Sequence, residues 1–472
     1  MAKEHEAIYD ARKLGVAKML VLGFQHTFAM FGATVLVPLL TGLNIATTLL
    51  MAGLGTLLFH LISKGKVPAF LGSSFAFLGG YAAVAPLSGA GGMSNAELLP
   101  YACLGVACAG LVYLILAGLI KAVGVKKVMR FFPPVVTGPI IISIGLGLAG
   151  SAVGNCQKNW LIAFIALAIV IIFNIWGKGM AKIIPILLGV LGSCAVAAIL
   201  ALVAGQTVTV DGAPYIALFG NENLLLFSSD ALQRLAEAPW IGLPIQWNNT
   251  VFGGVDWSNS SLIISSIVAI MPIALATMME HIGDISAISS TVGKNFLADP
   301  GLHRTLTGDG LATTLSALFG GPANTTYGEN TGVLALSKVY DPKVIRIAAV
   351  IAVILSFSPK FEALVALIPT AVIGGISFVL YGMISAIGVR NVVENKVDFT
   401  KSRNLIVAAI ILVSALGLGT LSFSIGGLVI SLSALAVASI AGIVLNAILP
   451  GNDYQFATDK AEDAKTGVDF KV

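Results

Sequence analysis

The chain has 472 residues, of which 57% are apolar and only 11% are charged, and its mean hydropathy is +0.94. Runs of about 20 apolar residues recur along its length, which excludes a soluble globular protein and predicts a polytopic protein of the lipid bilayer. The net charge of +4 needs no nucleic-acid partner. The four cysteines lack metal-site spacing, so they are interpreted as packing residues, and neither a metal nor a cofactor is expected.

Residues 1–16 are polar and charged, which is atypical of a secretory signal, so the first apolar segment is expected to remain in the protein. Residues 1–16 and the tail, 449–472, are expected to be cytoplasmic. Fourteen apolar segments between them are predicted to span the membrane and to give an all-α fold: residues 17–41, 45–63, 69–85, 98–120, 132–153, 159–176, 183–204, 262–287, 303–321, 323–338, 343–358, 364–388, 404–420 and 425–448.

The distribution of basic residues supports this count and sets the orientation. With the N-terminus in the cytoplasm, only Lys158, Arg234 and Lys360 of the 27 basic residues fall on the outer side. Cytoplasmic loops are enriched in Lys and Arg, and a missed or invented span in mid-chain would destroy this bias. Both termini are therefore predicted to lie on the cytoplasmic side of the cell membrane.

A long polar stretch, residues 205–261, is expected to lie outside the cell. It contains Trp240, Trp247 and Trp257, which are typical of side chains anchored at the membrane–water interface. A gating role for this loop is the alternative.

The stretch divides the chain into two halves of seven predicted spans whose sequences echo one another. An odd number of spans per half forces opposite orientations, so the halves are expected to form a 7+7 inverted repeat. Three short matches occur in the same order in both halves: Phe24–Thr27 with Met279–Ile282, Ser73–Phe75 with Tyr327–Glu329, and Pro133, Val136 and Gly138 with Pro369, Val372 and Gly374.

The third and tenth predicted spans are short or interrupted. Pro68 and Pro86 confine the third, so that its helix would reach only about 26 Å across a hydrocarbon core of about 30 Å. The tenth is bounded by Pro322 and Pro342 and interrupted by Gly328. Broken spans at matching places expose backbone N–H and C=O groups in mid-membrane, so spans three and ten are expected to contain short extended segments that form the substrate site. Ordinary helix packing through small residues is the alternative.

Glu280 and Glu329 are carboxylates within predicted spans eight and ten. An ionised carboxylate costs about 2.5–3.5 kcal/mol at the bilayer centre, so each is expected to be functional. A structural hydrogen bond between two broken helices is the alternative for each. Asp284 lies one turn after Glu280 on the same helix face, and two acids this close are suited to carry a proton.

Other polar residues within the predicted spans have less specific interpretations. His26 is either a packing residue or part of a proton relay, and His281 points to a different face from Glu280. Asp309 and Arg390 are interpreted as solvated or interface-paired charges near helix ends. No nucleophile–base pair accompanies the acids, so the protein is not expected to be an enzyme.

The chain resembles the nucleobase/ascorbate transporter (nucleobase:cation symporter-2) family, and within it the bacterial uracil permeases. The similarity covers residues 17–448 and includes the motifs GKVPAFLGSSFAFL, MEHIGD, DPGLHR, NTTYGENTG and LYGMISAIGVR. The family signature, Glu/Gln/Pro-Asn-x-Gly-x4-Thr-Arg/Lys, is met from Glu329 to Lys338, with Ser337 in place of Thr.

The resemblance implies a core domain (residues 17–120 and 262–358) that moves against a gate domain (residues 121–204 and 359–448). It also implies a homodimer formed through the gate domain, and uptake of a nucleobase together with a proton. The substrate-binding residues that it implies are Phe75, Glu280, Gly328 and Glu329. The residues that it implies for proton coupling are Glu280, Asp284, Glu329 and His26.

Asp284 bears on the substrate that the resemblance implies. Uracil permeases have His at this position and many purine-transporting relatives have Asp, but those relatives usually carry Gln-Asn where this chain has Glu329-Asn330. Proton-coupled import of uracil by alternating access is therefore expected, and a xanthine or purine permease is the alternative. A passive nucleobase channel or a sensor is the alternative from another class.

Overall fold

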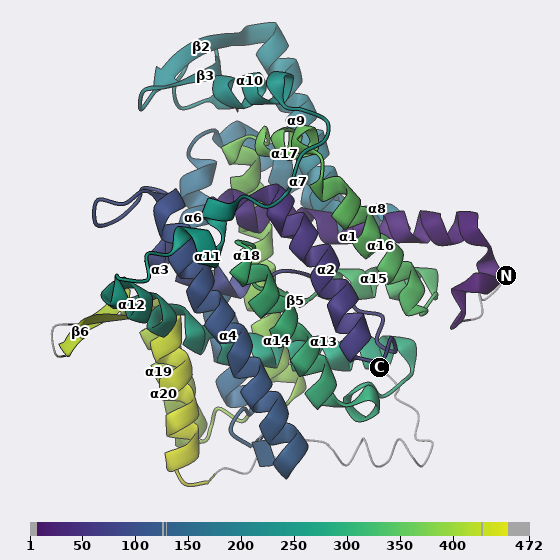
Figure 1. The fold of residues 1–472 in the computed structure, drawn as a ribbon, viewed down its shortest axis with the longest axis vertical. Helices are drawn as coiled ribbons and strands as arrows, with labels where there is room; N and C mark the ends of the chain where they lie inside the picture. Colours follow the sequence, from purple (N-terminus) through teal and green to yellow (C-terminus); the bar gives the residue numbers. More distant parts are fainter. Residues whose placement is uncertain (1–6, 125–126, 129, 426–427, 452–472) are drawn as a thin grey trace.

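The computed structural model describes residues 7–124, 127–128, 130–425 and 428–451, and it is predominantly helical (Figure 1). Seven of the described helical segments are long and apolar enough to cross a membrane. The number is eight if α16 (Pro342–Ser356) and α17 (Pro359–Ala366), which meet at 91°, form one broken span. The protein is therefore a polytopic membrane protein. The count of fourteen spans stays a prediction, because the other apolar helices have only 10–17 residues.

The helices of the first half lie close to the predicted spans. Proline begins α6 and α9, where its missing N–H would have no intrahelical partner. Ser94 and Glu97 form a capping box at the start of α4. In chain order, the elements are α1 (Val16–Thr41), α2 (Ile45–Ile62), the turn η2 (Phe75–Phe77), α3 (Leu78–Val84), α4 (Asn95–Val123), α6 (Pro134–Cys156), α7 (Trp160–Trp176), α8 (Met180–Ile183) and α9 (Pro185–Ala204).

The second half begins with short helices and then continues with longer ones. Its elements are α10 (Ser229–Glu237), η3 (Trp247–Asn249), α11 (Val251–Gly254), α12 (Ser260–Ile270), η4 (Met271–Ile273), α13 (Ala274–Val292), η5 (Leu297–Gly301), α14 (Leu302–Leu318), α15 (Gly328–Ser337), α16, α17, α18 (Thr370–Glu394), α19 (Ser402–Gly417) and α20 (Ala434–Ile448).

Three small antiparallel sheets accompany the helices, so the fold is predominantly helical and, outside the extended segments expected in spans three and ten, the prediction of an all-α fold is wrong. One of them lies within the two spans predicted to be broken. The pairings are β1 (Leu71–Ser73) with β5 (Asn324–Thr326), the sheet β2 (Gly205–Val210), β3 (Ala213–Leu218) and β4 (Leu225–Ser228), and β6 (Thr420–Ile425) with β7 (Leu428–Ser433).

The hairpin of β6 and β7 replaces the start of the fourteenth predicted span. The sequence of β6 alternates polar and apolar residues, and two glycines separate the strands along the chain. This period of two is typical of a β-hairpin. The high apolar content of the segment concealed the alternation, and α20 begins at Ala434 instead of near residue 425.

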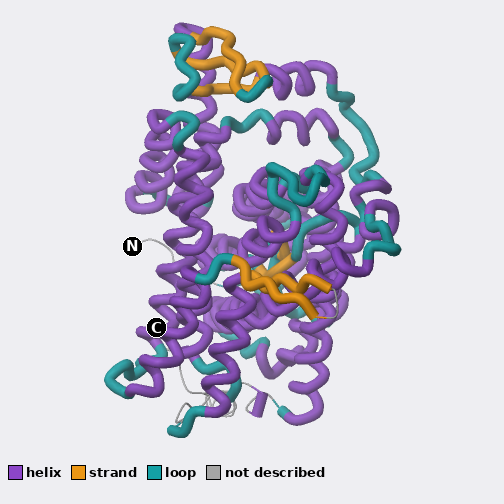
Figure 2. Tube along the Cα trace, turned by 90° about the vertical axis from the view of Figure 1, so that its left-hand side faces the viewer, coloured by secondary structure: helices purple, strands orange, loops and turns teal. Residues whose placement is uncertain are grey.

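The predicted outer loop, residues 205–261, contains regular structure. Its sheet of β2, β3 and β4 forms, together with α10, a small cap at one end of the helical bundle, at the top of Figures 1 and 2. Trp240, Trp247 and Trp257 follow the cap in the chain, and all three are exposed. Their role as interfacial anchors stays a prediction.

Helices α6 and α18 approach each other closely through glycines. A Cβ atom on Gly145 would collide with the carbonyl oxygen of Tyr381, and one on Gly388 would lie 2.8 Å from the carbonyl oxygen of Gly138. Backbones can pack at this distance only where a residue has no side chain. The two helices therefore form a tightly packed pair.

We expect the substitution Gly145→Leu to force α6 and α18 apart and to lower the thermal unfolding midpoint of the purified protein. Overpacking of this kind costs roughly 1–3 kcal/mol. The control is Gly147→Leu on the same helix, because a Cβ atom on Gly147 would meet no neighbouring atom. Equal midpoints for the two variants would contradict the close packing described here.

A second group of helices surrounds the strands β1 and β5. Helix α14 packs against α2 and α4, and α16 packs against α1 and α2. Helix α13 packs against α4, α6, α14 and α15. The two strands therefore lie in the interior of this group, where all six of their residues are buried.

Candidate functional site

Strands β1 and β5 come from opposite halves of the chain and form a two-stranded ribbon. Main-chain hydrogen bonds continue the pairing beyond the strands, because the N–H of Ser74 donates to the carbonyl of Ala323 and that of Tyr327 to the carbonyl of Phe70, each at 2.9 Å. Extended backbone is tolerated at membrane depth only where its polar groups are satisfied by protein. The ribbon is therefore a stable element, with the register Leu71–Thr326, Gly72–Thr325 and Ser73–Asn324.

Polar side chains from three helices fix the ribbon in place. The hydroxyl of Tyr327 donates to the carbonyl of Ser73 at 3.0 Å and accepts from the hydroxyl of Thr34 on α1 at 3.2 Å. Thr56 on α2 bonds to the backbone of β1, and Thr313 on α14 donates to the backbone of β5. The helices that follow the strands therefore start from fixed positions.

Each strand leads into a helical turn whose first N–H groups lack a capping side chain. Ser74 precedes η2 and Tyr327 precedes α15, and neither makes a side-chain hydrogen bond to its helix. The first N–H groups of a helix have no intrahelical partners, and the helix dipole makes that end positive. The start of α15 at Gly328 can therefore bind an acceptor oxygen.

Three acids gather beside the start of α15. Glu280 and Asp284 lie one turn apart on α13, and Glu329 lies in the first turn of α15. A Cβ atom on Gly328 would lie 3.6 Å from Oδ1 of Asp284, which places this carboxylate against the helix start. Glu329 lies close enough to Glu280 and Asp284 to interact with both electrostatically. The structure thus brings four of the predicted site residues together.

Part of the surface between α13 and α15 is accessible. Glu280, Gly283 and Gly328 are exposed although other helices surround α13. No group in the described residues hydrogen-bonds to the carboxylate of Glu280 or Asp284. A carboxylate within a protein needs water or a ligand when protein partners are lacking. These acids are therefore available to a substrate.

Phe75 lies where the helices around the ribbon meet the pair of α6 and α18. Its ring is half-buried and meets the ring of Tyr381 on α18 edge to face, with centroids 6.5 Å apart and an interplanar angle of 74°. Edge-to-face contact is a favoured geometry for aromatic pairs. The part of the Phe75 ring that stays exposed is available to a planar ligand.

His26 joins α1 to α15. It is fully buried, and the side-chain amide of Asn330 donates to its Nδ1 and to its carbonyl oxygen, each at 3.1 Å. Asn330 belongs to the family signature and follows Glu329 directly, so this contact holds the first turn of α15 in position. The role of His26 in proton coupling stays a prediction.

Asp309 is fully buried in the middle of α14, so its interpretation as a solvated or interface-paired charge near a helix end is wrong. Its carboxylate accepts from the hydroxyl of Thr326 at 3.3 Å and lies 3.4 Å from Nδ1 of His281, which is also buried. The signal that could have found it is a charge inside predicted span nine. Arg390, in contrast, is exposed and paired with Glu394 at 2.7 Å, as expected.

The groups of this site are suited to binding a ligand. Within the described part of the chain, no group of three or more His, Cys, Asp or Glu side chains is placed to hold a metal ion. The site offers carboxylate acceptors, helix-end N–H donors and an aromatic ring. A small planar molecule with its own donors and acceptors fits these groups.

The apolar helices around this polar site define an integral membrane protein, and the comparisons place it in the permease class. The chain belongs, within that class, to the nucleobase/ascorbate transporter family, and the family model described as "Permease family" matches residues 17–423. The resemblance seen in the motifs is thereby confirmed.

Curated relatives match nearly the whole chain. The uracil permease of Bacillus caldolyticus is 39% identical over 92% of this chain and 93% of its own length. The putative pyrimidine permease RutG of Escherichia coli K12 is 37% identical over 94% and 92%, and the uracil permease of the same strain is 36% identical over 94% of each. These relatives are named as permeases and not as enzymes.

Solved structures share the fold at low sequence identity. The transmembrane domain of the cyanobacterial bicarbonate transporter BicA has a TM-score of 0.61 at 16% identity and covers 93% of this chain and 99% of that one. SLC26A9 has a TM-score of 0.61 at 11% identity, with 93% and 66% covered. At these identities the likeness concerns the fold alone.

Proposed function

We propose that this protein imports uracil across the cell membrane together with a proton, with both of its termini in the cytoplasm. The observation that carries the proposal is the grouping of Glu280 and Glu329 beside the uncapped start of α15. The names of the relatives, uracil and pyrimidine permeases, point to the substrate class.

Uracil matches the groups of this site. Its ring carries N–H donors next to C=O acceptors, so Glu280 and Glu329 accept from its N–H groups while the N–H groups at the start of α15 donate to its carbonyl oxygens. The ring of Phe75 stacks on the base. Pairing at both edges makes the site selective, because a ligand lacking one group leaves a buried partner unsatisfied.

The proposal includes a 7+7 inverted repeat with a core and a gate domain. Its support is a correspondence between the contacts of the two halves. Replacing each helix by its counterpart in the other half turns the pair α4–α14 into α16–α2, and the pair α7–α18 into α19–α6. All four pairs are in contact, and α6 also packs on its own counterpart, α18. In the proposal, the first two pairs belong to the core domain, the others belong to the gate, and a homodimer forms through the gate.

Proton coupling follows from the acids of the site. An empty, ionised core would carry its charges against an apolar barrier, so the proton and uracil together allow the core to move. Glu280, Asp284, Glu329 and His26 are the residues proposed to handle the proton. One proton descending 100 mV supplies about 2.3 kcal/mol, enough for roughly 40-fold accumulation.

Transport into proteoliposomes tests the proposal. Radiolabelled uracil should accumulate under an inward proton gradient, and a protonophore should abolish the accumulation. Dependence on sodium would overturn the coupling to protons. Equilibration without accumulation would identify a passive channel, and binding without uptake would identify a sensor.

A purine permease is the second candidate, favoured by the carboxylate of Asp284 against Gly328. If uracil is the substrate, we expect excess xanthine to leave labelled-uracil uptake within about twofold of its value and Asp284→His to retain uptake, because an imidazole replaces a carboxylate within the same space. Thymine and 5-fluorouracil serve as competitors with a pyrimidine ring. Strong competition by xanthine that Asp284→His removes would identify a purine permease.

A further inference from the structure

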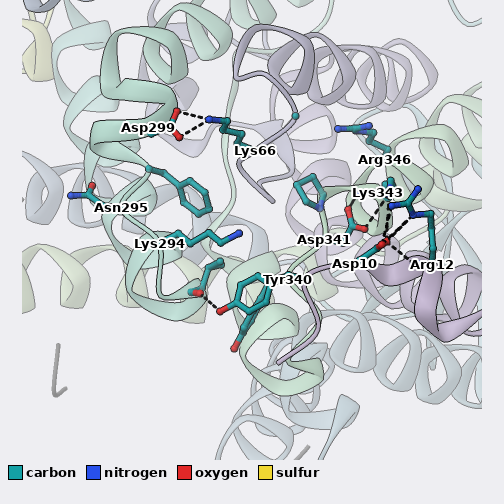
Figure 3. A pocket seen from close by; sticks show the side chains of 15 residues that line it. Asp10, Arg12, Lys66, Lys294, Asn295, Asp299, Tyr340, Asp341, Lys343 and Arg346 are labelled. Carbon is teal, nitrogen blue, oxygen red and sulfur yellow. Dashed lines mark hydrogen bonds and ion pairs between the residues drawn. The ribbon is translucent and has the colours of Figure 1, made fainter. Parts of the chain in front are cut away.

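A cavity separate from the acidic site lies at the C-terminal end of α13. It has a volume of about 700 Å³ and is lined by the chain before α1 and by the connections α2–β1, α13–α14 and α15–α16 (Figure 3). In the proposed topology all of these segments are cytoplasmic. The cavity is thus assembled from both halves of the chain.

The N-terminal segment forms one wall of this cavity and is held by specific contacts. The N–H of Ile8 donates to the carbonyl of Lys338, and the N–H of Tyr340 donates to the carbonyl of Ile8, both at 2.8 Å. The hydroxyl of Tyr9 donates to the carbonyl of Val292 at the end of α13 at 2.9 Å. The wall is therefore a built part of the fold.

Each of the three acids that line the cavity has a basic partner. Asp299 accepts from Lys66 at 2.7 Å, and this hydrogen bond holds the pKa of Asp299 below its ordinary value. Asp10 pairs with Arg12 at 2.9 Å, and that hydrogen bond lowers the pKa of Asp10. Asp341 lies 3.6 Å from the ammonium group of Lys343. Each of these acids is therefore matched by a neighbouring cation.

Two further cations, Lys294 and Arg346, line the cavity without a carboxylate. The ammonium group of Lys294 lies 4.5 Å from the ring centroid of Tyr9, and Nε of Arg346 donates to Nδ1 of His60 at 3.4 Å. In the part of the chain that the structure describes, neither makes an ion pair with an acid. Figure 3 shows Lys294 near Tyr340, below the Lys66–Asp299 pair, with Arg346 on the other side of the view. The cavity therefore carries an excess of positive charge.

We propose that this cavity binds an anion bearing a phosphate group. Ammonium and guanidinium groups on different walls suit the several oxygens of a phosphate, which accept charge-assisted hydrogen bonds from both. The volume of about 700 Å³ admits a ligand considerably larger than phosphate itself. The anion is either a soluble phosphate compound or the head group of an anionic lipid, since both present the same chemistry.

The proposal is independent of the transported substrate. Uracil is uncharged at neutral pH, and its proposed site is acidic, whereas this cavity is basic. Binding of the anion joins Lys294, which follows α13, to Arg346 on α16. Because α13 carries Glu280, the anion braces the helix that forms one side of the transport site.

The test uses the full chain in nanodiscs of phosphatidylcholine and measures saturable binding of radiolabelled inorganic phosphate. In a second arm, the nanodiscs contain phosphatidylglycerol, and the thermal unfolding midpoint is compared with that in phosphatidylcholine. The variant is Lys294→Gln with Arg346→Gln. The control, Lys178→Gln with Lys182→Gln, removes the same charge from an exposed connection on the same proposed side.

Phosphate binding that weakens about tenfold or more in the variant but not in the control supports a soluble ligand. A stabilisation by phosphatidylglycerol that only the variant loses supports a lipid head group. If neither ligand has an effect, or if variant and control respond alike, the proposal is overturned. Lys294→Arg with Arg346→Lys should restore the response, which separates lost charge from misfolding. Uracil uptake is measured independently, so failure of one proposal leaves the other intact.

Discussion

Proteoliposomes containing the Glu280→Gln variant are expected to show no accumulation of uracil under an inward proton gradient, although the protein stays folded. Gln keeps the shape of the side chain but cannot become ionised. Its amide N–H groups would face the N–H groups of uracil, and two donors form no hydrogen bond. A hydrogen bond to a charged group contributes about 1.5–3 kcal/mol, so affinity should fall roughly 10- to 150-fold. Within the described part of the chain, no group hydrogen-bonds to the carboxylate of Glu280, so the substitution breaks no hydrogen bond there.

The matched control is Glu394→Gln, because Glu394 is exposed and its ion pair among the described residues is with Arg390 on the protein surface. Exchange of labelled for unlabelled uracil, which needs no net proton movement, separates the two roles of Glu280. Loss of accumulation with retained exchange would restrict Glu280 to proton coupling. Accumulation equal to that of the unmodified protein would exclude Glu280 from the site.

Among the substitutions proposed here, Asp309→Ala should lower the stability of the folded protein most. It should also abolish uracil uptake. Asp309 is buried, accepts from Thr326 in the ribbon and lies beside His281, the neighbour of Glu280. Removing the acceptor leaves buried donors on Thr326 and His281 unsatisfied, and each such donor costs about 1–3 kcal/mol. Thermal unfolding of the purified protein measures the loss.

Asp309→Asn keeps a hydrogen-bonding side chain of the same size and should unfold at a higher temperature than Asp309→Ala. It also removes the charge, so its uracil uptake shows whether the charge or the hydrogen bond is required. The control is Asp256→Ala, at an exposed position outside the helices. Unchanged unfolding and uptake in both Asp309 variants would show that this buried contact contributes nothing.

The acids of the site could be predicted because their signals are local. Glu280 and Glu329 stand out as charges within apolar runs, and Gly328 marks the interruption of the tenth segment. The start of α15 at this glycine then follows from the chain itself. What the pattern could not supply is the pairing of the two broken segments into a ribbon, because the register depends on contacts between the halves.

The misinterpreted residues depend on distant partners. In the sequence Asp309 looks like a surface charge, because its partners His281 and Thr326 lie on two other elements. Strand β7 lies within the fourteenth predicted span because a count of apolar residues ignores the period of two in this hairpin. The basic cavity is formed by the N-terminal segment and three connections, each of which resembles an ordinary cytoplasmic segment when considered alone.

The pairing of β1 with β5 has a consequence for biosynthesis. About 250 residues separate the two strands along the chain, and at 5–20 residues per second their synthesis takes roughly 10–50 s. During this interval the first strand has no partner for its backbone polar groups, and an unsatisfied group costs several kcal/mol in hydrocarbon. The nascent first half must therefore shelter this segment beside water, the translocation machinery or its own helices until the second half arrives.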